Sequence, residues 1–190
     1  MNRRLAMLLA VIAAVLVPAG LLAADERESS AASSKVKVRF LACVEFLTPP
    51  VFPPCVSREF NGDSIQTTGS GLFKIEADGD GEIEGSGTFI HRNPAGVEVA
   101  RGTWRAKKFL AYRTYGCAGC PALPPGSEGG NLLFTAELRP AGGNEFDATL
   151  EINCALGTPP PNRLYEGVEV RVLGLRFDQA EDGATLFIRE

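Results

Sequence analysis

The sequence predicts an all-β fold, a single antiparallel β-barrel or β-sandwich of about eight to nine strands that follows an N-terminal signal peptide. Apolar and polar residues alternate along 36–46, 132–138 and 146–152, whereas helical periodicity is nearly absent. Such alternation is typical of strands with one face in water and the other in a core. The chain also has 21 Gly and 13 Pro, which favour turns between short strands. We favour a barrel because neighbouring segments pair readily in sequence order.

The first 24 residues have the pattern of a secretory signal peptide. Asn2-Arg3-Arg4 precedes the apolar stretch 5–22, and Ala23-Ala24 comes before a charged run. This order predicts cleavage near Ala24 and a secreted or periplasmic product, with an uncleaved membrane anchor as the alternative. Residues 25–34 lack apolar periodicity and are expected to be a disordered linker, so that 35–190 forms one antiparallel β domain.

The charge of the expected mature chain excludes one class of partner. Loss of Arg3 and Arg4 lowers the Lys and Arg count from 19 to 17, against 23 Asp and Glu, which gives a net charge of −6. An acidic chain is a poor general binder of nucleic acid. No later segment has the length and hydropathy of a membrane span, so no span is expected after cleavage. The partner is expected to be a small molecule, a glycan or a protein.

The stretch 69–89 predicts a β-hairpin. A three-residue turn at 78–80 places Phe73 opposite Gly85 and Lys74 opposite Glu84, with the apolar residues on one face. The glycines of this stretch are expected to leave room for aromatic rings. Further strands are expected at about 97–115, 167–177 and 184–189. The apolar face of the first of these changes parity near 100–102, which indicates a β-bulge.

Five cysteines point to disulfides in an oxidising compartment. Two bridges and one free thiol allow fifteen arrangements, among which the sequence does not decide. Cys117-Ala118-Gly119-Cys120 has the spacing of a redox motif, but prolines rather than a helix follow it. The same pair is also half of a zinc site without evident further ligands. We therefore expect structural bridges among Cys43, Cys55, Cys117, Cys120 and Cys154, with no metal and no cofactor.

A basic stretch supplies the candidate binding surface. Residues 99–127 contain five Lys or Arg and no Asp or Glu. On a regular strand most of these bases share one face, with aromatic residues interleaved, and such a surface suits an anionic ligand, glycan or partner. The alternative is a solvated strand face balanced by acidic neighbours. The candidate residues are Arg101, Trp104, Arg105, Lys107, Lys108, Tyr112 and Arg113.

No catalytic residue can be assigned from the sequence. His91 is the only histidine, and no nucleophile motif or phosphate-binding loop accompanies it. The sequence therefore favours a non-enzymatic protein that binds a ligand or partner. Two alternatives stay open, namely an exported thiol–disulfide or hydrolytic enzyme and a structural component of the cell envelope.

Overall fold

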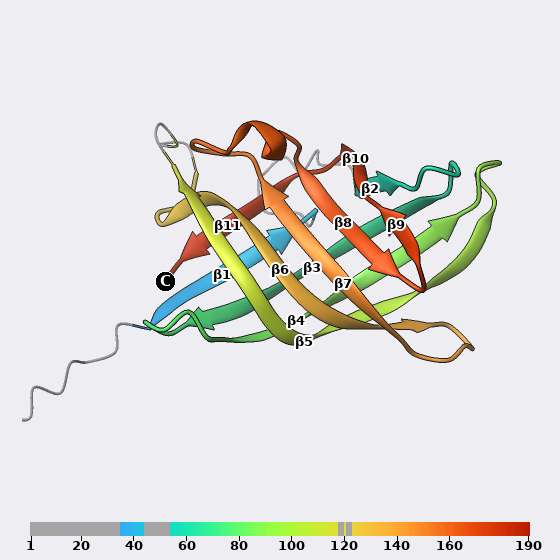
Figure 1. Ribbon diagram of the computed structural model, residues 1–190, viewed down its shortest axis with the longest axis horizontal. Coiled ribbons are helices and arrows are strands. Elements are labelled where there is room, and N and C mark those ends of the chain that lie inside the picture. Colours follow the sequence, from blue (N-terminus) through green and yellow to red (C-terminus); the bar gives the residue numbers. More distant parts are fainter. Residues whose placement is uncertain (1–34, 44–53, 118–119, 121–122) are drawn as a thin grey trace, which may run out of the picture. The chain divides into compact units, whose positions relative to one another are not determined.

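The computed structural model describes residues 35–43, 54–117, 120 and 123–190 (Figure 1). The expected signal peptide 1–24 and linker 25–34 lie outside these residues, as does the expected continuation of the first strand to residue 46. Among the described residues we find no helix that would reach across a bilayer.

The described chain folds into eleven strands that belong to one antiparallel sheet. Besides them, the described ranges contain one regular element, the short 3-10 helix η1 (Pro161–Arg163). The strands are β1 (Val36–Ala42), β2 (Cys55–Arg58), β3 (Ser64–Ile75), β4 (Gly81–Arg92), β5 (Glu98–Gly116), β6 (Ser127–Pro140), β7 (Phe146–Cys154), β8 (Gly167–Val172), β9 (Leu175–Phe177), β10 (Gln179–Asp182) and β11 (Thr185–Arg189). The predicted all-β class is confirmed, with more strands than the eight to nine expected.

The strand pairing closes on itself. Strands β2 to β9 pair in sequence order, and β10 adds to the free side of β2. Strand β1 pairs with β3 and β11, and β11 pairs with β6. Strands β3, β4, β5, β6, β11 and β1 therefore form a closed ring of hydrogen-bonded neighbours, which is the topology of a barrel. Figure 1 shows β1 beside β3 and β6 beside β7.

Aromatic side chains fill the space inside the ring. Phe40 of β1 lies 5.9 Å from Phe134 of β6 and 6.5 Å from Trp104 of β5 between ring centroids. Phe73 of β3 makes similar contacts with Tyr112 and other rings, at 4.7 Å in the nearest case. Ring pairs at such separations are attractive and bury much apolar area. The interior of the barrel is thus a packed core.

The register of the β3–β4 hairpin differs from the prediction by two residues. Phe73 pairs with Ile83 and Lys74 with Glu82, because the three-residue loop is 77–79 rather than 78–80. The physical reason is Gly79, whose φ of +90° suits the last position of such a loop. A shift by two preserves the faces, so the predicted inward and outward residues are still correct.

The extra strands arise where the sequence signal is short. Strands β2 and β10 have four residues each, too few for a clear alternation. The expected strand 167–177 is a tight hairpin, because Leu173 and Gly174 have φ of +50° and +84°. Positive φ at both residues is the mark of a type I′ turn, and leucine gives no sequence signal for one.

Candidate functional site

Strand β5, which carries the predicted binding surface, contains several bulges. Its pairing shifts once at Val99, next to the bulge predicted near 100–102, and again between Ala106 and Lys108 and between Phe109 and Ala111. Each bulge inserts one residue and exchanges the two faces. All five bases are nevertheless exposed, and the bulges interrupt only their regular spacing along the strand.

The two aromatic residues of that surface belong to the core. Trp104 is only 2% exposed, and its indole nitrogen donates a hydrogen bond of 2.9 Å to the carbonyl oxygen of Thr68. The hydroxyl of Tyr112 donates to Glu128 Oε1 at 2.9 Å, while its ring packs on Phe73. Burial and the negative charge of Glu128 raise the pKa of Tyr112. Trp104 is thus largely buried, although it also lines the hollow described below.

Two of the bases have carboxylate partners. Arg101 pairs with Glu98, and the hydrogen bond raises the pKa of the guanidinium while lowering that of Glu98. Lys107 pairs with Glu137 at 2.8 Å, with the same opposed shifts of the two pKa values. Within the described ranges no carboxylate lies within 4.0 Å of the cationic groups of the other three bases, which are Arg105, Lys108 and Arg113.

A large hollow lies on the outer face of β1, β3, β4, β5 and β6. It has a volume of about 1130 Å³ and opens to solvent. Besides charged groups, its lining has glycines, the apolar residues Leu41, Leu72 and Trp104, and four short hydroxyl side chains. The hydroxyl side chains face outward because they alternate with the inward core residues. We call this feature the hydroxyl hollow, and its floor hydroxyls are those of Ser70, Ser86, Thr88 and Thr103.

Strand register explains how the hydroxyls come together. Ser70 pairs with Ser86, which in turn pairs with Arg105 of β5. One row further, Thr88 pairs with Thr103 and also shares a hydrogen bond of 2.8 Å with Thr68. Cross-strand neighbours lie about 5 Å apart, so these hydroxyls form one continuous polar surface on the floor of the hollow.

Charged side chains surround this floor. Four are basic and three are acidic, and most of them pair with one another. In the described part of the chain, two make no ion pair within 4.0 Å, one basic (Arg105) and one acidic (Glu84). An arginine presents several N–H donors in a planar fork, and a carboxylate accepts several hydrogen bonds. The charged residues are Lys37, Arg39, Glu84, Arg105, Glu137, Arg139 and Glu190.

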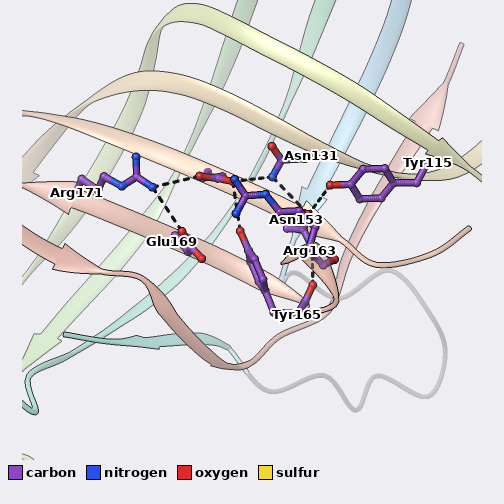
Figure 2. Close-up of polar contacts among 8 residues, drawn as sticks. Tyr115, Asn131, Asn153, Arg163, Tyr165, Glu169 and Arg171 are labelled. Carbon is purple, nitrogen blue, oxygen red and sulfur yellow. Dashed lines mark hydrogen bonds and ion pairs between the residues drawn. The ribbon is translucent and has the colours of Figure 1, made fainter. Parts of the chain in front are cut away.

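A second polar cluster lies on the outer face of β6, β7 and β8 (Figure 2). Glu151 and Glu169 stand opposite each other on β7 and β8 and are 4% and 5% exposed. Glu151 Oε1 accepts a hydrogen bond from Asn131 at 3.0 Å and lies 2.7 Å from the guanidinium of Arg163. Arg171 reaches both carboxylates, at 3.5 and 3.8 Å. We call this group the Glu151 cluster.

Glu151 and Glu169 are two close carboxylates in different environments, as are the general acid and general base of some enzymes. Burial and the neighbouring Glu151 raise the pKa of Glu169, and burial also raises that of Tyr165. However, Arg163 and Tyr165 come from the segment that follows β7 and lie directly on the pair. With this segment in place, both carboxylates are buried. The cluster therefore serves as a polar anchor for the segment 155–166.

The cysteines form two bridges, as the sequence predicted without assigning them. Cys43 is bonded to Cys55, and Cys117 to Cys120. After the second bridge the described chain enters strand β6 at Ser127, so no helix N-terminus lies there to activate a thiol. Cys154 is unpaired and buried at the end of β7, where burial raises its pKa to about 12.

His91 has a carboxylate partner that the sequence did not reveal. Its Nε2 lies 2.8 Å from Asp63 Oδ2, and its ring meets the edge of Phe177. Asp63 precedes β3, and the pairing of His91 with Ile65 brings the two side chains together. A nucleophile motif was absent from the sequence, and the described residues hold no group of three potential metal ligands.

Comparisons of the chain with protein-family models, with curated proteins and with solved structures found no match.

Proposed function

We propose that this protein is an exported, non-enzymatic β-domain that binds a hydroxyl-rich ligand of oligosaccharide size in the hydroxyl hollow. The observation that carries the proposal is Arg105, a guanidinium with no carboxylate within 4.0 Å among the described residues, beside a floor of serine and threonine hydroxyls. Such a group offers charge-assisted hydrogen bonds, which are stronger than neutral ones.

The form of the hollow supports this class of ligand. Its volume of about 1130 Å³ exceeds what a drug-sized molecule needs, and it is open along the sheet. The hollow is open and combines hydroxyls and charged groups with Leu41, Leu72 and Trp104, whereas the usual site of an apolar molecule is an enclosed apolar pocket. The packed aromatic core also argues against carriage of an apolar ligand inside the barrel.

Two features support export. The N-terminal pattern of a basic start, an apolar stretch and small residues is that of a signal peptide. Two disulfides are typical of proteins that fold outside the cytosol. Mass spectrometry of the product from culture medium or periplasm tests the point, and a mature chain starting near Asp25 is the expected result. A full-length chain retained in the cytosol would contradict it.

Binding is tested with an immobilised panel of neutral and acidic oligosaccharides, followed by calorimetry on any sugar that is retained. Arg105→Gln is expected to weaken binding about 10-fold or more, the loss typical of a hydrogen bond to a charged group. Lys108→Gln is the matched control, because Lys108 is another unpaired base of β5 but lies outside the hollow. Equal losses in the two variants would instead favour the wider basic surface, and retention of no sugar would overturn the proposal.

A further inference from the structure

One carboxylate at the edge of the hydroxyl hollow is shared by two bases. Glu190, which follows β11, places Oε2 2.6 Å from Lys37 Nζ and accepts a hydrogen bond of 3.0 Å from Arg39 Nε at Oε1. Its backbone N–H donates to the carbonyl oxygen of Lys37 at 2.9 Å, which fixes the residue beside β1. Both cations and the carboxylate line the hollow.

The three side chains differ in exposure. That of Glu190 is 24% exposed, whereas those of Lys37 and Arg39 are 45% and 56% exposed. The hydrogen bond from Lys37, and then that from Arg39, lowers the pKa of Glu190, so the carboxylate is ionised at neutral pH. Lys37 and Arg39 thus form a carboxylate-binding site in the hollow, and the side chain of Glu190 occupies it.

We infer that the ligand of the hydroxyl hollow carries carboxylates, as uronic acid oligosaccharides do, and that Glu190 is an internal competitor that holds the place of one of them. The inference rests on the proposed function. Without Glu190, the hollow would present four bases against two acids, Glu84 and Glu137. Glu137 is already shared by Lys107 and Arg139, so the region around Arg39 would attract an anion.

Displacement of Glu190 requires little free energy. Exposed ion pairs contribute little to stability, because water and salt screen them and ordering long side chains has an entropic cost. A sugar carboxylate that also uses the floor hydroxyls replaces the pair and gains further hydrogen bonds. The tethered side chain nevertheless competes at a high effective concentration, so its removal is expected to raise affinity by up to about five-fold.

The test measures binding of an oligogalacturonate and of a neutral galacto-oligosaccharide of equal length to the full mature chain. Glu190→Gln is expected to bind the oligogalacturonate up to about five-fold more tightly than wild type and the neutral sugar equally well. Arg39→Gln is expected to lose affinity for the oligogalacturonate alone. Glu181→Gln is the matched control, since it removes another exposed carboxylate, paired with Arg58 and outside the hollow, and changes the net charge equally.

The outcomes separate the inference from the proposed function. Binding of the neutral sugar that depends on Arg105, with no effect of Glu190→Gln on the oligogalacturonate, overturns the inference and leaves the proposed function standing. An equal gain from Glu181→Gln also overturns it, because net charge would then explain the effect. Failure of both sugars to bind wild type and Glu190→Gln overturns both.

Discussion

The indole ring of Trp104 lies directly against Gly87, where a Cβ atom would come within 2.5 Å of Nε1 and 1.8 Å of the Thr68 carbonyl oxygen. The same ring lies over Gly69, the strand partner of Gly87. Phe40 uses Gly71 and Gly85 in the same manner. The glycines of the β3–β4 hairpin are therefore the sites at which large rings approach the backbone.

Gly87→Ala is expected to destabilise the protein by about 2–3 kcal/mol, because the added methyl group overlaps both a backbone oxygen and the indole. Urea unfolding followed by tryptophan fluorescence measures the change. Gly143→Ala is the control, since a Cβ there meets only Pro140 atoms, at 3.3 Å or more, and the cost is expected to stay below about 0.5 kcal/mol. A stability of Gly87→Ala equal to that of the control would contradict the packing argument.

Alternation predicted the long strands and their faces, because one face of the sheet is wet and the other is packed on rings. The hairpin register was wrong by two residues, since Gly79 and Gly81 flank Asp80 and the sequence offers two ways to place a three-residue loop. The hydroxyl hollow was not predictable, because it combines residues of five strands and depends on their registers. Only Arg105 of its charged residues belonged to the predicted surface, which the bulges of β5 divide.

Leu173 is expected to weaken the β8–β9 turn. Its φ of +50° is rare for a residue with a Cβ atom, and its side chain is 70% exposed, so little packing compensates. Leu173→Asn is expected to raise the free energy of unfolding by about 0.5–1 kcal/mol, because asparagine suits the first position of a type I′ turn. Leu173→Val, with a branched Cβ, is expected to have the opposite effect. Thermal denaturation of both variants measures this, and a loss of stability in Leu173→Asn would disprove it.

Cys154 is expected to be unreactive in the folded protein. Burial, and then the negative charge of Glu166, raises the pKa of its thiol to about 12, so only about one molecule in ten thousand carries a thiolate at about pH 8. Titration with a thiol reagent should find almost no reaction in buffer and one thiol per chain in urea. Cys154→Ala should give none in either condition. Reaction of native protein, or three thiols in urea, would contradict the structure.

The opposed carboxylates of the Glu151 cluster are expected to respond differently to neutralisation. Glu169 has a folded pKa above its ordinary value of 4.5 because of burial and the charge of Glu151. The folded state therefore holds that proton more tightly than the unfolded chain does. The contribution of Glu169 to the free energy of unfolding falls as the pH rises from its ordinary pKa through its raised pKa in the folded state. At neutral pH the full destabilising effect of the buried charge applies. Glu169→Gln should thus stabilise the protein at pH 7 by up to about 1 kcal/mol, the scale of a cross-strand pair.

Glu151→Gln tests the other half of the argument. Glu151 is the partner of Arg163, Arg171 and Asn131, so its neutralisation leaves the partly buried guanidinium of Arg163 without its nearest counter-ion. We expect a loss of about 1–3 kcal/mol at pH 7 and looser attachment of the segment 155–166, which limited proteolysis detects. Urea unfolding at pH 7 and at about pH 4 separates the two carboxylates, because the gain of Glu169→Gln should vanish at the lower pH. If both variants change stability in the same direction at pH 7, the two carboxylates contribute to stability in the same way. The contrast between a destabilising charge on Glu169 and a stabilising charge on Glu151 would then be wrong.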